Sequence, residues 1–150
     1  MAGLEQHERG AAPAPEQAPA NARMQMLLVA RCGPGGSGLG VPRLMQASRD
    51  EAARHALTGG LLFDGETLVQ CLDGPAEAVR HLATQWLSHP ALHDARLLQA
   101  LGPVTAAPPL PTPWLAGFVD GDALEWVVQA PSPLARMAAF TQALLRADVL

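Results

Sequence analysis

The chain has 150 residues, of which 49% are hydrophobic and 16% charged, and its formal net charge is −4. This length and composition predict one globular domain with a sizeable core. The negative charge disfavours binding to nucleic acid, and no stretch approaches the ~20 continuous apolar residues of a membrane span. All ten basic residues are arginine and there is no tyrosine.

The N-terminal residues 1–23 are rich in Ala, Pro, Glu and Gln, so we expect a disordered tail. The first ten residues lack the basic start and apolar run of a signal peptide. Cys32 and Cys71 form no Cys-x-x-Cys pair and both fall in predicted strands. We interpret them as small buried residues of a protein in the reducing cytoplasm.

The ordered chain is expected to begin with a strand and a helix. Met24–Cys32 is a compact apolar run, typical of a central strand covered on both faces. The glycine-rich stretch Gly33–Gly40 lacks the Lys-Ser/Thr of a phosphate loop and the dinucleotide spacing, so we interpret it as a connector. Apolar spacing of three and four then predicts a helix over Val41–His55. Its inner face would carry Val41, Leu44, Met45, Ser48, Ala52 and His55.

The centre of the predicted fold is a hairpin over Leu57–Gly74. Two apolar runs, Leu57–Phe63 and Thr67–Leu72, flank Asp64-Gly65, which tolerates the positive φ angles of a tight turn. Gln70 is the one strongly polar residue expected to point inward there. A buried amide costs free energy unless it is hydrogen-bonded, and its partner could be backbone, water or a ligand.

A second helix is predicted over Pro75–Ser88, with Asp73 or Gly74 near its cap. The loop after it carries His89, His93 and Asp94, but no further ligand stands at a recognised metal-site spacing, so we predict no metal site. The buried stripe of the helix is expected to be Val79, Leu82, Ala83, Trp86 and Leu87.

The C-terminal part is predicted to hold two more strands and a last helix. Strands are expected at Ala95–Val104 and Trp114–Val119, separated by the proline-rich loop Ala106–Pro113. Ala123–Gln129 is compatible with helix or strand. Ser132-Pro133 is a helix start. The apolar stripe that follows is Leu134, Met137, Phe140, Thr141, Leu144 and Leu145, which we interpret as core.

This order predicts an α+β protein with a ferredoxin-like βαββαββ plan, a single sheet with two helices on one face, plus a C-terminal helix. The C-terminal helix would cover the other face or dock on a partner. We expect a disordered tail at 1–23, the domain at 24–122 and a C-terminal helical extension at 123–150.

Several motifs resemble those of one family. They are Ser48-Arg49, Leu57-Thr58-Gly59 and Leu68–Gly74, followed by a W-x-x-G-F pattern at Trp114–Phe118. Together they are similar to the BLUF family, bacterial blue-light sensors that use FAD. The resemblance covers about Met24–Val119 and agrees with the order of elements read independently.

The resemblance implies a flavin ring between the first two helices, above the sheet. Gln70 and Trp114 match the family's glutamine and tryptophan. The light-active tyrosine falls on Leu28, which has no phenolic proton, so the usual photocycle is expected to be absent. The two asparagines that hold the ring fall on Glu51 and Ala52, and the methionine near the tryptophan falls on Ala116.

Two functions remain open at this point. One is a sensory domain that still binds FAD and acts through contact with an unknown protein partner. The other is a flavin-free interaction or scaffold module that keeps the fold and fills the pocket with its own side chains. An enzyme is not expected, because no Ser-His-Asp or Cys-His arrangement is readable. The resemblance is also compatible with a homo-oligomer.

Overall fold

The computed structural model describes residues 22–32, 40–102 and 114–149. The predicted tail at 1–21, most of the glycine-rich connector and the proline-rich loop therefore lie outside the described residues. The first strand begins at Arg23, the last residue of the expected tail, and the carbonyl of Ala22 accepts a hydrogen bond from the N–H of Ala76.

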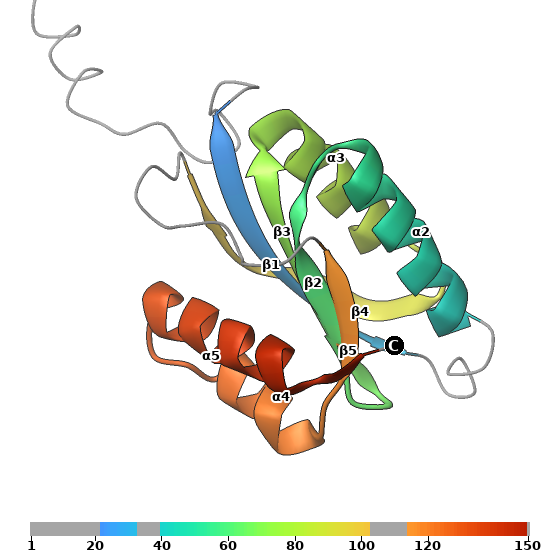
Figure 1. Ribbon diagram of the computed structural model, residues 1–150. Helices are drawn as coiled ribbons and strands as arrows, with labels where there is room; N and C mark the ends of the chain where they lie inside the picture. Colours follow the sequence, from blue (N-terminus) through green and yellow to red (C-terminus); the bar gives the residue numbers. More distant parts are fainter. Residues whose placement is uncertain (1–21, 33–39, 103–113, 150) are drawn as a thin grey trace, which may run out of the picture.

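The fold is one mixed sheet with helices on both faces, which confirms the predicted α+β class (Figure 1). The strand order is β4-β1-β3-β2-β5-β6, in which β2 and β5 are parallel and the other neighbours antiparallel. The strands are β1 (Arg23–Cys32), β2 (Thr58–Phe63), β3 (Thr67–Pro75), β4 (Leu92–Leu101), β5 (Leu115–Phe118) and β6 (Asp148–Val149). The helices are α2 (Gly40–Arg54), α3 (Ala76–Leu87), α4 (Gly121–Val128) and α5 (Pro133–Arg146).

The predicted hairpin is formed by β2 and β3. In its turn, Oδ1 of Asp64 accepts hydrogen bonds from the N–H groups of Glu66 and Thr67, at 2.8 and 2.6 Å, and Gly65 has a φ of +103°. Gly59 on β2 has a φ of +127°, and a Cβ there would collide with the carbonyl oxygen of Cys71. The backbone geometry of β2 therefore requires glycine at position 59.

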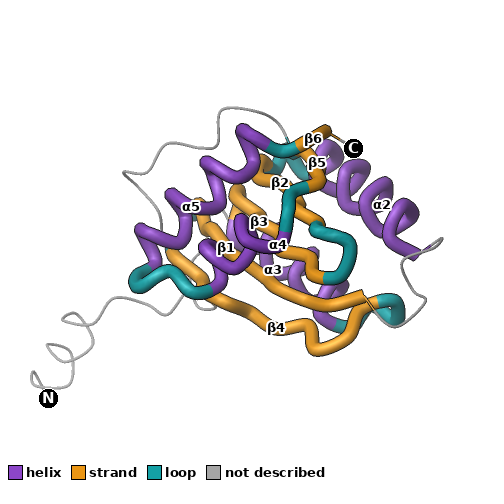
Figure 2. The backbone as a smooth tube through the Cα atoms, turned by 90° about the horizontal axis from the view of Figure 1, so that it is seen from below, coloured by secondary structure: helices purple, strands orange, loops and turns teal. Residues whose placement is uncertain are grey.

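Each face of the sheet has its own apolar core. Helices α2 and α3 cover one face, and α4 and α5 cover the other (Figures 1 and 2). Successive residues of β1 alternate between the cores, with Leu28 in the α2–α3 core and Leu27 in the α4–α5 core. This confirms the prediction of a first strand covered on both faces. The C-terminal helix covers the second face of the sheet, which was one of its two predicted positions.

The structure settles one local alternative and differs from several other expectations. The segment left open at 123–129 is helix α4, and the short strand β6 was not foreseen. Strand β4 begins at Leu92 and so includes His93 and Asp94, which were assigned to a loop, and it ends three residues before Val104. Cys71 is buried but Cys32 is partly exposed. Three leucines expected in apolar stripes are exposed instead: Leu87, Leu134 and Leu145.

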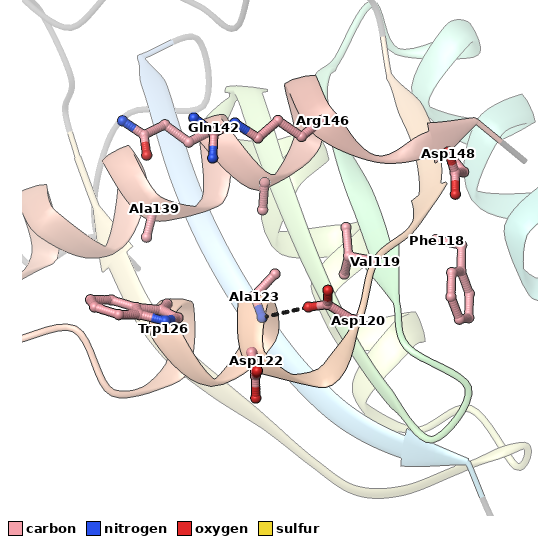
Figure 3. Close-up of a pocket in the computed structure, with 11 residues that line it drawn as sticks. Phe118, Val119, Asp120, Asp122, Ala123, Trp126, Ala139, Gln142, Arg146 and Asp148 are labelled. Carbon is pink, nitrogen blue, oxygen red and sulfur yellow. Dashed lines mark hydrogen bonds between the residues drawn. The ribbon is translucent and has the colours of Figure 1, made fainter.

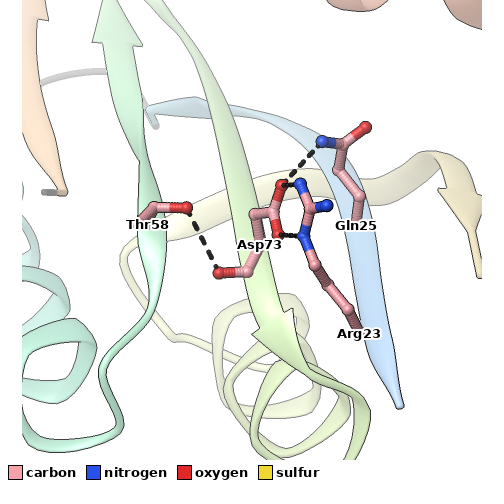
Figure 4. Close-up of polar contacts among 4 residues, drawn as sticks. All are labelled: Arg23, Gln25, Thr58 and Asp73. Carbon is pink, nitrogen blue, oxygen red and sulfur yellow. Dashed lines mark hydrogen bonds and ion pairs between the residues drawn. The ribbon is translucent and has the colours of Figure 1, made fainter. Parts of the chain in front are cut away.

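Gln70 is not the sole buried polar side chain, because Gln25 and Asp73 are also buried. Asp73 does not cap α3. It accepts hydrogen bonds from Arg23 Nε and Nη2 and from Gln25 Nε2, at 2.7, 2.8 and 2.7 Å (Figure 4). The hydrogen bonds that Arg23 donates to Asp73 raise the pKa of the Arg23 guanidinium. The cluster fixes the start of β1 to the end of β3. In the described part of the chain, no helix is long and apolar enough to cross a membrane.

Candidate functional site

A small pocket lies between α2 and α3, above β3. Its volume is about 70 Å³. Gln70 and Leu72 form its floor on β3, and the helices form its walls. The wall residues are Leu44, Ala47, Ser48 and Glu51 on α2, with Leu82, Gln85 and Trp86 on α3.

Unpaired polar atoms gather at this pocket and in the core beside it. Gln70 is 2% exposed, and its Oε1 accepts no hydrogen bond from any residue that the structure describes. The indole N–H of Trp86, which lines the pocket, and that of Trp114, which lies in the α2–α3 core, donate no hydrogen bond to any residue that the structure describes. Each such buried group costs about 1–3 kcal/mol unless a partner is supplied. Strand β3 therefore keeps Gln70 buried, and its unpaired oxygen lowers the stability of the folded state.

Leu28 stands directly opposite Gln70 in the β1–β3 register and is fully buried. Its side chain belongs to the same α2–α3 core as those of Ala52, Trp114 and Ala116. The structure thus places these four predicted positions together in apolar packing. They do not line the pocket.

Glu51 lines the pocket but is engaged elsewhere. Its carboxylate pairs with Arg54 on the same helix, and its Oε2 lies 3.3 Å from Nε2 of His55. Arg49 lies over the Trp114 ring, 5.8 Å from the centroid, in cation–π geometry. The charged groups of α2 therefore stabilise its own surface and the outer side of Trp114.

Residues 32–102 match the family model described as "BLUF: Sensors of blue-light using FAD". This part of the chain is similar to a BLUF domain. The match begins at the end of β1 and runs to the end of β4, so it includes the pocket helices and the hairpin. A search of curated proteins found no match.

Solved BLUF structures share this fold. The photo-activated state of BlsA is 12% identical, with 85% of this chain and 98% of that chain covered and a TM-score of 0.69. The dark state of BlrB, a BLUF protein, is 20% identical, with 83% and 96% covered and a TM-score of 0.64. A bacterial light-regulated adenylyl cyclase is 15% identical, with 78% and 32% covered and a TM-score of 0.58. The fold thus also occurs as part of a longer enzyme.

The BLUF family uses FAD, but the residues of this pocket do not fit a flavin ring. Pockets for ligands of that size have about 300–1,000 Å³, several times the volume found here. Glu51 presents a carboxylate that can only accept hydrogen bonds, and Ala52 is buried and offers none. Among the described residues that line the pocket, the unpaired Oε1 of Gln70 and the indole N–H of Trp86 would gain from a polar ligand.

Sequence reasoning missed some residues of this domain. Trp86 was read as ordinary core, because it falls on the apolar stripe of α3, and its position on the pocket wall is a tertiary feature. A larger hollow between α4, α5 and the ends of β5 and β6 was also missed (Figure 3). An exposed tryptophan, Trp126, was its one signal in the sequence, within the segment whose structure was left open.

Other reactive chemistry is sparse in the described ranges. They hold no group of three or more His, Cys, Asp or Glu side chains placed to bind a metal ion. Burial raises the pKa of the Cys71 thiol well above its ordinary value, so Cys71 stays protonated and unreactive at neutral pH. Burial also raises the pKa of Cys32.

Proposed function

We propose that this protein is a regulatory module that acts through contact with a protein partner and lacks the tyrosine-dependent light response of BLUF domains. One observation carries the proposal. The buried residue opposite Gln70 is Leu28, in a chain that contains no tyrosine.

Leucine cannot replace a tyrosine in light-driven proton transfer, because it has neither an exchangeable proton nor a hydrogen-bonding atom. Trp114 lies in the same core and has an aromatic ring. It is an indole N–H donor only, so it does not supply the phenol that would both donate to and accept from Gln70. A rearrangement of the Gln70 amide triggered from β1 has no starting point in this sequence.

The same packing supports a flavin-free state as the first candidate. Leu28, Ala52 and Ala116 are each 0% exposed, so apolar atoms fill the positions where the family resemblance expects polar contacts. The pocket that remains, of about 70 Å³, has room for one or two water molecules, which would satisfy the Gln70 oxygen.

A second candidate is a BLUF domain that holds FAD weakly and without the usual photochemistry. The unpaired Oε1 of Gln70 favours it, since a buried acceptor without a partner is the kind of atom that a ligand can satisfy. Loss of the ring contacts at Glu51 and Ala52 weighs against it. At about 1 kcal/mol for each lost hydrogen bond, two such losses weaken binding by roughly thirtyfold.

The proposal also assigns no enzymatic activity and a cytoplasmic location. It is supported by the sensory character of the family and by the absence of a nucleophile–base pair from the motifs of the sequence. In the light-regulated adenylyl cyclase, the part that is similar to this protein makes up 32% of the chain. In this protein we assign the transfer of the signal to contact with a separate protein.

Light-minus-dark absorption spectroscopy tests the proposal. The protein is purified from cells supplied with riboflavin, and spectra are recorded before and after blue illumination, with excess FAD present. We expect a difference spectrum without the red-shifted flavin band of a BLUF signalling state. A reversible red shift that decays in the dark would overturn the proposal.

A further inference from the structure

A second hollow lies on the opposite face of the sheet from the α2–α3 pocket. We call it the α4–α5 groove; its volume is about 700 Å³, ten times that of the pocket near Gln70. Its wall includes Phe118, Asp120, Asp122, Trp126, Arg146 and Asp148, which come from the end of β5, α4, the end of α5 and β6 (Figure 3).

The groove has an exposed aromatic anchor. Trp126 is 75% exposed, whereas Trp86 and Trp114 are 4% and 7% exposed. Phe118, at the end of β5, is 41% exposed. Trp126 also borders an adjoining hollow of about 330 Å³ that includes Glu125. An indole that separates two hollows on the surface is typical of an interaction site, because tryptophan is enriched among the residues that dominate binding energy.

The charge around the groove selects its occupant. Four carboxylates line the two hollows, on Asp120, Asp122, Glu125 and Asp148, against one cation on Arg146. Oδ1 of Asp120 accepts a hydrogen bond from the N–H of Ala123 at the start of α4. The resulting negative potential repels nucleic acid and anionic lipid surfaces and attracts cations.

The chain itself offers no good occupant. Residues 1–21 contain three glutamates and one arginine, so their formal charge is −2, and residues 33–39 and 103–113 contain no charged residue. A second copy of the chain brings a net charge of −4. Charge complementarity therefore favours a different, basic protein.

We propose that the α4–α5 groove binds a basic segment of a partner protein, with an arginine side chain stacked on Trp126. This inference rests on the proposed function, since it locates the surface of the protein contact. Arginine stacks on tryptophan through its planar guanidinium, and the neighbouring carboxylates pair with the same kind of side chain.

The groove is held in shape by Arg136 on α5. Its Nε donates to the carbonyl of Val127 at 3.1 Å, and its Nη2 donates to those of Val128 and Ala130 at 3.2 and 3.1 Å. Its Nη1 donates to Oε1 of Gln99 on β4, at 2.8 Å. The end of α4 is thus tied to α5 and to the sheet. A surface fixed in this way loses less entropy on binding.

The test uses the full-length protein and a short fluorescein-labelled peptide that alternates arginine and leucine, followed by fluorescence anisotropy. A twin peptide with glutamate in place of arginine is the charge control. We expect the arginine peptide to bind and to shift the indole N–H signal of Trp126 in a ¹⁵N spectrum, while the signals of Trp86 and Trp114 stay in place. The glutamate peptide should not bind.

Two sets of variants locate the contact. Trp126→Ala should weaken binding of the arginine peptide about tenfold or more, whereas Leu134→Ala, which removes another exposed apolar side chain outside the groove, should not. Asp122→Asn with Glu125→Gln should also weaken binding about tenfold. Asp50→Asn with Glu77→Gln makes the same change in charge on α2 and α3 and should leave binding unchanged.

No binding of the arginine peptide, equal binding of the glutamate peptide, or equal effects of the groove and control variants would each overturn the inference. The readouts separate it from the proposed function. Failure of the groove leaves the difference spectrum without a red shift, whereas failure of the proposed function appears in that spectrum and not in the peptide titration.

Discussion

Leu28 on β1 lies directly opposite Gln70 on β3, and both side chains are buried on the α2–α3 face of the sheet. Residues paired in this way lie within contact distance of each other. An amide whose Oε1 has no partner in the described structure therefore faces a side chain that cannot supply one. In the proposed alignment with the BLUF family, Gln70 matches the family's glutamine and Leu28 takes the place of its tyrosine.

The first prediction concerns the restoration of the pocket. Glu51→Asn with Ala52→Asn removes a charge and adds amide groups that can donate and accept, so we expect FAD to be retained on purification, unlike in the unchanged protein. Adding Leu28→Tyr should give a reversible red shift on blue illumination. The absorption spectrum measures both steps.

The double variant that keeps Leu28 is the matched control for the triple variant. It should bind FAD but show no red shift. If the triple variant takes up no FAD, the assignment of these positions to a flavin pocket is wrong.

The second prediction concerns the cluster around Asp73. Arg23→Ala leaves a carboxylate that is 1% exposed with Gln25 as its remaining side-chain donor, and should lower the free energy of unfolding by about 3 kcal/mol. Arg31→Ala is the control on the same strand, because its partner Glu66 is 65% exposed, and it should cost less than about 1 kcal/mol. Urea denaturation measures both. Equal costs would show that the buried pair is no more important than the exposed one.

The third prediction is a loss of stability at alkaline pH. The pKa of Cys71 is raised in the folded state, so unfolding releases its proton once the pH exceeds the ordinary thiol value of 9.0. Stability is fully present below pH 9 and should fall above it, by about 1.4 kcal/mol per pH unit. The chain has no tyrosine or lysine to titrate in this range, so urea denaturation between pH 8 and 11 isolates the thiols.

Cys71→Ala should remove most of this slope. The remainder belongs to Cys32, which is less completely buried and whose pKa is also raised. A slope that persists unchanged in Cys71→Ala would contradict the assignment.

The fourth prediction concerns Arg136. Arg136→Leu removes three hydrogen bonds to backbone carbonyls near the end of α4 and one to Gln99, and should cost about 2 kcal/mol. Amide hydrogen exchange should rise in α4 more than in α2. Arg96→Leu, at an exposed position of β4, is the control and should change neither quantity. Uniform changes in exchange across the sheet would argue against a local tie.

The parts of the fold that could be predicted are those specified by local pattern. The apolar spacing of α2, the Asp64-Gly65 turn and the apolar run of β1 each constrain their own segment. Strand β6 has two residues and carries no pattern of its own, since it forms only where α5 returns the chain to β5. Asp73 looked like a helix cap because it precedes α3, but Arg23 lies 50 residues away in sequence.

The candidate sites divide in the same way. Gln70 could be found because an amide between apolar residues is conspicuous in a strand. The exposure of Leu134 and Leu145 could not be predicted from the sequence. Helical periodicity shows which face of a helix is apolar, but it does not show how much of that face the rest of the protein covers. The α4–α5 groove is lined by two separate stretches of the chain, 118–126 and 139–148, and neither stretch carries its signal alone.

Titration of the purified protein into FAD, followed by the fluorescence anisotropy of the flavin, tests the central claim most directly. Because the pocket is small and neither Glu51 nor Ala52 offers a donor to a flavin ring, we predict that the anisotropy stays flat up to protein concentrations at which the Glu51→Asn and Ala52→Asn double variant saturates. A saturable rise with one FAD bound per unchanged chain would contradict the claim.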